Sequence, residues 1–359
     1  MIHDTLVVDA VIHPYDLAPA NQDRSARPQL DSVYAAHRLA GDPDRREFTL
    51  TEEEFFTDFA YPGLASALFA ESQVDLGIIR SLPNLGFCLG NVTDPWRAAA
   101  FRDEHPSRFR MFATVQTPVL DDAIAQLEAQ VRDLDVIGLK VYPAFFYDGL
   151  GEGWRLDGPD YATPLLEAAR DMGIRHVAVH TALWLPPAPK DAFRIDDLES
   201  PLDRFSDMTF QIVHAGTAFL DQTCELLARH PNTYATLETT FQFIVARPEL
   251  FAKILSSMLA AAGSERLLYA SGCNLMHPRP LLEPFAGYEL PRELLEEKGI
   301  AQLTEQDRRN IFGENVMRLY GLDASELRQD LAGDAFAGAT DAGFAEPWSV
   351  LRTAKASRR

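Results

Sequence analysis

The chain has 359 residues, 47% hydrophobic and 24% charged, so its length and composition allow one large buried core. Its 53 acidic residues exceed its 33 basic ones, and a net charge of −20 repels nucleic-acid phosphates and anionic lipid headgroups. Three scattered cysteines, no bilayer-length apolar run and no secretory signal pattern predict a cytoplasmic protein without nucleic-acid or membrane partners.

Short apolar runs rich in β-branched residues alternate with helix-length amphipathic segments along most of the chain. Nearly continuous apolar character is typical of parallel strands that are covered on both faces. Eight such runs are present, at residues 6–13, 74–81, 110–116, 136–143, 175–182, 210–216, 233–238 and 266–272. Helical patterns follow them, as in 120–134, where Ile124, Leu127 and Val131 share one face. Eight strand–helix pairs predict a (β/α)₈ TIM barrel. The alternative, a doubly wound open sheet, lacks the glycine-rich phosphate-binding motif expected after a strand.

Two stretches fall outside this repeat. Within a barrel of residues 1–322, the polar segment 16–50 is predicted to be a long insertion loop after the first strand, where such barrels build specificity. Residues 323–359 are predicted to form a carboxyl-terminal extension. The apolar segments 53–64 and 333–348 offer surface for a partner chain, or else they cover their own barrel.

Histidines stand where three of the predicted strands end. His13 ends the first strand, His180 the fifth and His214 the sixth. Because the carboxyl ends of barrel strands converge on one mouth, these side chains suit a divalent transition metal, with zinc expected first and iron or manganese as alternatives. A single buried histidine is more often a hydrogen-bonded core residue, but three at the same rim favour a metal site.

Other polar residues lie near the same rim. Lys140, near the end of the fourth strand, could neutralise an anionic substrate or pair with a buried carboxylate. Glu238, at the end of the seventh, could be a metal ligand, a proton shuttle, an orienting partner of a histidine, or half of a structural salt bridge. His277 follows the eighth strand in a loop from which it could reach the site.

The order and spacing of several motifs resemble the amidohydrolase-related branch of the amidohydrolase superfamily, which includes aminocarboxymuconate-semialdehyde decarboxylase and benzoate decarboxylases. The resemblance rests on VVDAVIHPYD, GLKVYP, VAVHTA, IVHAG, LLYASG followed by HPRP, and NIFGENVMRLYGL. It implies a metal-dependent hydrolase or decarboxylase that acts on a small carboxylated or amino-acid substrate.

Two positions of the family's metal site differ in this chain. The family begins with a His-x-His pair, of which Val11 takes the first place and His13 the second. An aspartate closes the family's eighth strand, and Gly272 stands there instead. That aspartate commonly takes a proton from metal-bound water, which glycine cannot do. Cys273 as a soft ligand and Glu238 as the base are the possible substitutes.

A narrower resemblance is to the two-subunit oxygen-using enzymes of the superfamily, such as the hydroxylase of 2-aminoisobutyrate. There one chain holds the reactive metal and a related chain accompanies it. The changes at Val11 and Gly272 make this chain look like such a partner. Two hypotheses follow: a metal-binding subunit of a hetero-oligomer with an incomplete ligand set, or a self-sufficient hydrolase or decarboxylase that acts alone or as a homo-oligomer.

Overall fold

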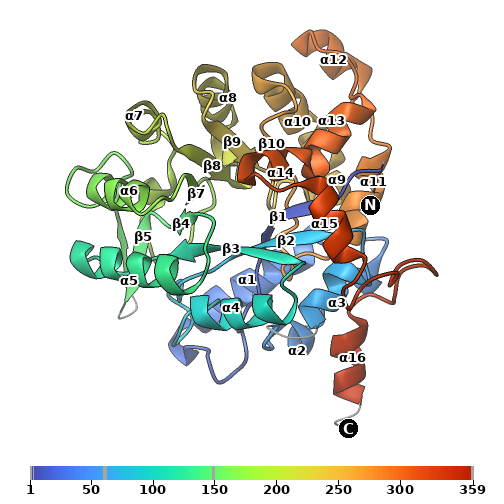
Figure 1. Cartoon of the computed structure of the whole chain (residues 1–359), viewed down its shortest axis with the longest axis horizontal. Helices are drawn as coiled ribbons and strands as arrows, with labels where there is room; N and C mark the ends of the chain where they lie inside the picture. Colours follow the sequence, from blue (N-terminus) through green and yellow to red (C-terminus); the bar gives the residue numbers. More distant parts are fainter. Residues whose placement is uncertain (1, 3, 60–62, 148–149, 357–359) are drawn as a thin grey trace.

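The computed structural model describes residue 2 and residues 4–59, 63–147 and 150–356. Eight parallel strands form one sheet in the order β1-β2-β3-β4-β7-β8-β9-β10, which curls into a nearly closed barrel surrounded by helices (Figure 1). These strands are β1 Val8–Ile12, β2 Leu76–Arg80, β3 Phe109–Thr114, β4 Leu139–Val141, β7 His176–His180, β8 Thr209–Val213, β9 Thr233–Thr236 and β10 Leu267–Leu268. Each predicted run overlaps one of them. The TIM-barrel prediction is confirmed, and the open sheet is wrong.

The barrel closes between the first strand and the segment that includes and follows β10. The backbone N–H of Ala10 donates to the carbonyl of Tyr269 at 3.0 Å. Farther along, Ile12 pairs with Cys273 in a parallel bridge. These contacts bring the end of β10 beside the end of β1, so residues that follow the two strands face the same mouth.

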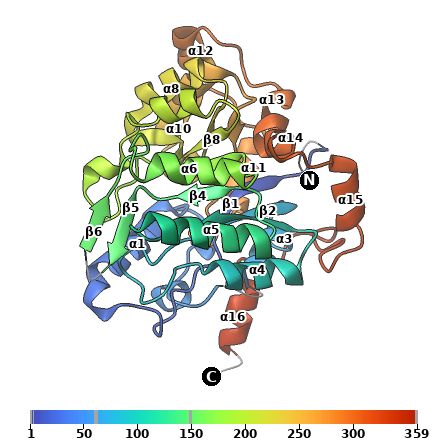
Figure 2. The same cartoon turned by 60° about the vertical axis from the view of Figure 1, so that its left-hand side comes forward.

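Amphipathic helices cover the outside of the barrel because each buries one apolar face against the strands. In α5, for example, Ala123 and Leu127 are buried, and this helix packs beside α6 (Figure 2). The helices outside the segments discussed below are α2 Glu52–Phe55, α3 Gly63–Phe69, α4 Pro95–Glu104, α5 Leu120–Asp133, α6 Ala162–Asp171, α7 Glu199–Arg204, α8 Leu220–Arg229, α9 Phe243–Ala246, α10 Pro248–Ala262, α11 Arg279–Ala286 and α12 Arg292–Lys298. In the described parts of the chain, no helix has the length and apolar character needed to cross a membrane.

The closing motif NIFGENVMRLYGL forms one irregular helical run. It continues α13 Glu305–Arg309 and consists of a π-helical turn, Asn310–Glu314, and α14 Asn315–Tyr320. A Cβ built on Gly313, inside this turn, would lie 2.1 Å from the carbonyl oxygen of Leu6. Glycine is therefore required here, because only its missing side chain lets the helix lie directly on the chain that enters β1.

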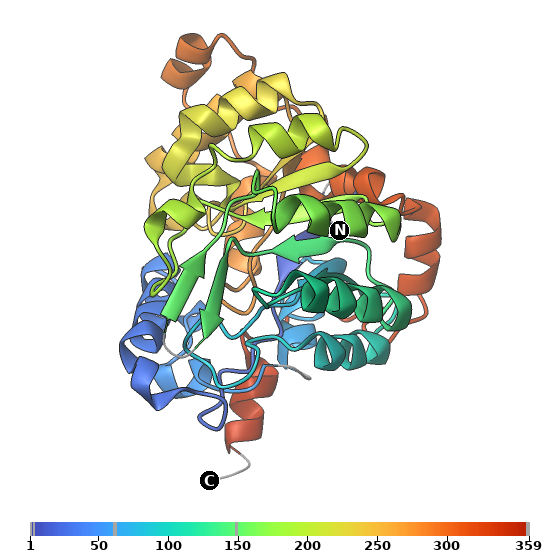
Figure 3. The same ribbon diagram turned by 90° about the vertical axis from the view of Figure 1, so that its left-hand side faces the viewer.

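The segment 16–50 contains a helix, which the sequence reading as a loop did not predict. Helix α1 spans Arg27–Ala40, with Pro28 in its first turn and a buried face that includes Leu30 and His37. The proline and this helical spacing were the available signals. The hairpin of β5 Ala144–Tyr147 and β6 Leu150–Gly153 follows β4 and lies at the same end of the barrel as α1 (Figure 3).

Apolar residues of the two proposed partner-binding segments pack on their own barrel. Phe55, Phe59 and Trp348 are almost fully buried, and the rings of Phe59 and Trp348 meet edge to face at 5.8 Å. For these three residues the structure favours the second alternative, a cover for the chain's own barrel, because their apolar area is already buried. Two helices lie beyond residue 322, α15 Ala324–Leu331 and α16 Ser349–Ala356, and α16 projects from the body of the molecule (Figures 1 and 2).

Candidate functional site

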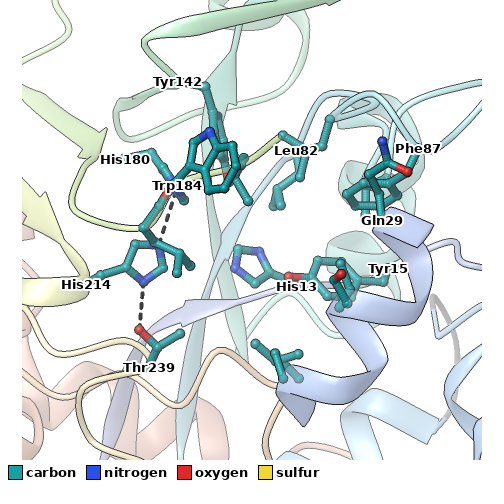
Figure 4. Close-up of a pocket in the computed structure, with 18 of the residues that line it drawn as sticks. His13, Tyr15, Gln29, Leu82, Phe87, Tyr142, His180, Trp184, His214 and Thr239 are labelled. Atoms are coloured by element: carbon teal, nitrogen blue, oxygen red, sulfur yellow. Dashed lines mark hydrogen bonds between the residues drawn. The ribbon is translucent and has the colours of Figure 1, made fainter. Parts of the chain in front are cut away.

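A pocket of about 260 Å³ opens at the carboxyl ends of the barrel strands (Figure 4). One wall comes from α1, and the others come from the segments that follow β1, β2, β4 and β7. Apolar side chains make most of the walls, while His13, His180, His214 and Glu238 place polar groups on the floor. The other lining residues are Tyr15, Leu17, Gln29, Ser32, Val33, Ala36, Leu82, Leu85, Phe87, Val92, Tyr142, Leu183, Trp184, Leu185, Pro186, Thr239 and Leu275.

His13 donates hydrogen bonds from both ring nitrogens. Its Nδ1 lies 3.0 Å from the carbonyl oxygen of Arg80, and its Nε2 lies 2.9 Å from Oε1 of Glu238. Both partners are acceptors, so both nitrogens carry hydrogen and the ring is an imidazolium. Tyr15 stacks on it with ring centroids 5.1 Å apart. His13 therefore presents a positive charge to the pocket floor and has no lone pair for a metal.

His180 and His214 form a second pair. Nε2 of His180 lies 2.8 Å from the carbonyl of Leu183, and its Nδ1 lies 3.2 Å from Nε2 of His214. Nδ1 of His214 lies 3.0 Å from the hydroxyl of Thr239. Burial is the main cause that lowers the pKa of both rings, to about 4 for His214, so both are neutral. The partners then assign the direction of each bond. The Thr239 hydroxyl donates to Nδ1 of His214, Nε2–H of His214 donates to Nδ1 of His180, and Nε2–H of His180 donates to the Leu183 carbonyl.

Glu238 is the buried anion of the site. Burial would raise its pKa, but the nearby His214, His13 and Lys140 outweigh burial and lower it to about 2. Its Oε2 lies 3.8 Å from Nδ1 of His214. A Cβ built on Gly272, which has φ +67°, would lie 3.1 Å from both Cγ and Oε1 of Glu238. The glutamate thus fills the space beside the backbone where the family's aspartate would project.

Lys140 is part of β4 and does not line the pocket. It is almost fully buried, and its Nζ is 4.7 Å from the centre of the Tyr142 ring. Burial lowers the pKa of Lys140 to about 7, although Glu238 opposes that change. The lysine consequently helps to stabilise the negative charge of Glu238.

Two other residues named from the sequence are not brought to the pocket. Cys273 is fully buried in the segment that pairs with β1, and burial raises its thiol pKa well above the usual value. Nε2 of His277 is hydrogen-bonded to Oε2 of Glu71 at 3.2 Å, and the ring packs against Trp348. Neither residue lines the pocket.

The sequence reading missed several residues that shape the site. Arg80 is a charged residue at the end of the apolar strand β2, and a charged residue near the end of an apolar strand is the same signal that indicated Lys140. Its guanidinium lies 3.4 Å from the centre of the Phe112 ring and donates to Gln211 at 2.7 Å. Trp184 gave no such signal, because an aromatic in a loop carries no periodicity.

The backbone is strained around the mouth. Ala182, His214 and Thr239, after or at the ends of three neighbouring strands, have φ values of +63°, +60° and +56°. Left-handed conformations are uncommon for residues with a side chain and collect at functional sites. The strained backbone and the pocket therefore both indicate that the functional site lies at this end of the barrel.

The present arrangement does not fit a metal ion. Among the residues that the structure describes, no three histidine, cysteine, aspartate or glutamate side chains are placed to bind one ion together. His13 has no free lone pair, and those of His180 and His214 are engaged. Three imidazoles and a carboxylate are suitable donor types, but their hydrogen bonds would have to open first. The three-histidine metal site stays a prediction.

Comparison with solved structures gives neighbours of the same fold. An uncharacterised TIM-barrel protein from Bordetella bronchiseptica has a TM-score of 0.60 and 17% identity, over 88% of this chain and 98% of that chain. The 5-carboxyvanillate decarboxylase of Novosphingobium aromaticivorans, solved with manganese and 4-hydroxy-3-methoxy-5-nitrobenzoic acid, has a TM-score of 0.57 and 13% identity, over 89% and 97%. A 2,6-dihydroxybenzoate decarboxylase from Rhizobium has a TM-score of 0.51 and 16% identity, over 89% and 99%.

At these identities the structural neighbours show the fold alone. Comparison with curated proteins finds no match. A family model described as amidohydrolase matches residues 14–322, which is most of the chain. The chain therefore belongs to the amidohydrolase family.

Proposed function

We propose that this chain binds a small, mainly apolar molecule at the barrel mouth and serves as the partner subunit of a related, metal-carrying chain in a hydroxylase-like enzyme. The observation that carries the proposal is the closed hydrogen bonding of the pocket floor. His13 pairs with Glu238 and His180 pairs with His214, so the polar groups satisfy one another. A self-sufficient hydrolase of this family needs a base beside metal-bound water, and Gly272 cannot supply it.

The pocket supports a ligand with an apolar body and one polar end. Its apolar walls stabilise a ring or branched chain by removing it from water. At the floor, the His13 imidazolium attracts a carboxylate, although Glu238 already balances its charge. Tyr15 and Tyr142 stack on His13 and His180 and hold these rings in place. The chain's own residues thus bind and orient the molecule.

Exposed apolar side chains on segments that adjoin one another near the pocket support a partner chain. Leu89 is 68% exposed, Leu150 62% and Trp184 45%. Their segments adjoin, because a Cβ on Gly86 would lie 3.1 Å from Pro187 and one on Gly151 would lie 2.3 Å from the backbone of Ala188. Exposed large apolar side chains on adjoining segments are typical of interaction surfaces.

Expression of this chain with any related chain from a neighbouring reading frame tests the proposal. We expect the two to co-purify and to show turnover only together. Turnover of about 1 s⁻¹ or more by this chain alone, on a small carboxylate or amide, contradicts it.

A self-sufficient metal-dependent decarboxylase is the second candidate. Three histidines and Glu238 meet at the floor of one apolar pocket, and two neighbours described as decarboxylases were solved with manganese. In this case His13, His180 and His214 would hold the ion, with zinc expected, and the ion would supply Lewis-acid chemistry. Elemental analysis would find about one ion per chain. The ion would be lost in His180→Ala or His214→Ala and kept in His105→Ala, a change outside the pocket lining.

A further inference from the structure

We infer that the buried His13–Glu238 ion pair takes the place of the metal ion in this chain, and that Gly272 is the small residue that makes room for it. This inference concerns the barrel mouth alone. It rests on the proposed function only in taking that mouth as the site, and the co-purification experiment tests the partner chain separately.

The first step of the argument is steric. The carboxylate of Glu238 reaches the mouth from the end of β9 and lies against the backbone of Gly272. A Cβ at residue 272 would contact Cγ and Oε1 of Glu238 at 3.1 Å, which is closer than ordinary van der Waals contact. An aspartate there would add a second carboxylate to the same space. A side chain at 272 would therefore require the Glu238 side chain to move from its present position.

The second step is electrostatic. A buried carboxylate needs a positive partner, which a metal-bound site obtains from its ion. In this chain the partner is His13, whose Nε2–H donates to Glu238 at 2.9 Å while its Nδ1–H donates to the carbonyl of Arg80. Lys140 adds positive charge. A dication bound by His13 would have to open its hydrogen bonds to Glu238 and to the carbonyl of Arg80.

The third step concerns the other two histidines. Their mutual hydrogen bond, 3.2 Å between Nε2 of His214 and Nδ1 of His180, directs their lone pairs at protein donors. Val11 cannot add the ligand that the first strand supplies in the family. The changes at Val11 and Gly272, together with the carboxylate of Glu238, thus act in one direction, toward a mouth that is neutralised without an ion.

Metal content is the first test. The purified wild-type chain is equilibrated with Zn²⁺ or Co²⁺, dialysed against metal-free buffer, and measured by elemental analysis and by the visible absorption of Co²⁺. We expect less than about 0.1 ion per chain and no tetrahedral cobalt band. About one ion per chain, lost in His180→Ala, overturns the inference whether or not a partner chain is found.

A double-mutant cycle is the second test. Gly272→Asp is made in wild type and in Glu238→Ala, with Gly299→Asp as the matched control, since Gly299 has φ +64° and no neighbouring atom within 4 Å of a built Cβ. We expect Gly272→Asp to lower the melting temperature by about 5 °C or more, the control by less than about 2 °C, and Glu238→Ala to remove at least half of the excess. Equal losses for Gly272→Asp in both backgrounds, or a loss no larger than the control's, overturn the inference.

Discussion

Two buried histidine–glutamate pairs in this molecule have the same residue types, but their histidines differ in charge. At the barrel mouth, His13 and Glu238 lie 2.9 Å apart; near α16, His277 and Glu71 lie 3.2 Å apart. His13 donates from both nitrogens and is charged. His277 donates from Nε2 and accepts from the backbone N–H of Arg279 at Nδ1, so it is neutral.

The two glutamates differ in the same way. Glu71 accepts from His277, from the hydroxyls of Ser66 and Ser349, and from the first backbone N–H groups of the α16 segment. Glu238 has one close hydrogen bond and is otherwise balanced by cationic or polar neighbours beside a pocket. A carboxylate saturated by neutral donors fastens one chain segment to another. A carboxylate held by charges beside a cavity can respond to a ligand.

The largest effect expected from this difference is on stability. Glu71→Gln places an amide donor among backbone and hydroxyl donors at the start of α16 and leaves at least one of them unsatisfied. We expect a loss of about 2–4 kcal/mol in the free energy of unfolding. In Glu238→Gln, His13 can lose its Nε2 proton and accept from the new amide, so both side chains keep a partner and we expect a loss of about 1 kcal/mol. Urea unfolding of both variants measures the difference.

Glu265→Ala serves as the control for both changes, because Glu265 is exposed. It should change the free energy of unfolding by less than about 0.5 kcal/mol. A Glu238→Gln loss as large as the Glu71→Gln loss would remove the distinction between a fastening pair and a pocket pair.

A third buried carboxylate, Asp9, sharpens the comparison because its hydrogen-bond donors are the neutral side chain and backbone of Ser271 and the backbone of Val11. Burial raises its pKa to about 7, although Ser271 and the backbone of Val11 donate to it. Between about pH 4 and pH 7 the unfolded chain loses this proton and the folded chain keeps it. The contribution of Asp9 to stability therefore falls as pH rises through that window.

Asp9→Asn isolates this effect. Asparagine cannot ionise, and the hydrogen bond it loses to Ser271 has a cost that does not depend on pH. We expect the stability of Asp9→Asn relative to wild type to rise by about 2 kcal/mol or more between pH 4.5 and pH 7.5. Urea midpoints at the two pH values measure it, and a constant difference would mean that Asp9 is ionised in the folded chain.

The barrel and the position of its mouth could be predicted from the sequence, because a strand buried on both faces leaves a nearly unbroken apolar run. The same pattern placed His13, His180, His214 and Glu238 at one rim, where the structure brings them together. Hydrogen-bond partners could not be predicted. That His13 pairs with Glu238, some 225 positions away, depends on the closure of the barrel and on side-chain rotation.

Helix α1 and the position of His277 are two features that were not predicted from the sequence. The many polar residues of α1 suggested a loop, although the sequence shows a proline in its first turn and buried residues at helical spacing. His277 looked free to reach the mouth because nothing local tied it to Glu71 or Trp348, which are distant in sequence. Long-range contacts of this kind are set by tertiary packing.

The smallest expected effect on stability comes from a change at Trp184, which lines the pocket mouth. Trp184 is 45% exposed, and its Nε1–H donates to the carbonyl of Ala188 at 2.6 Å. Trp96 on α4 is 48% exposed and does not line the pocket. Because both indoles are about equally exposed, Trp184→Ala and Trp96→Ala should each cost about 1 kcal/mol or less in stability.

Ligand affinity should separate the two variants. An aromatic wall of a pocket contributes dispersion and water exclusion to a bound ring, and its loss typically weakens binding about tenfold. Calorimetric titration with 2,6-dihydroxybenzoate as the probe should therefore show weaker binding for Trp184→Ala and wild-type binding for Trp96→Ala. Equal affinities in both variants would mean that the probe does not contact the mouth.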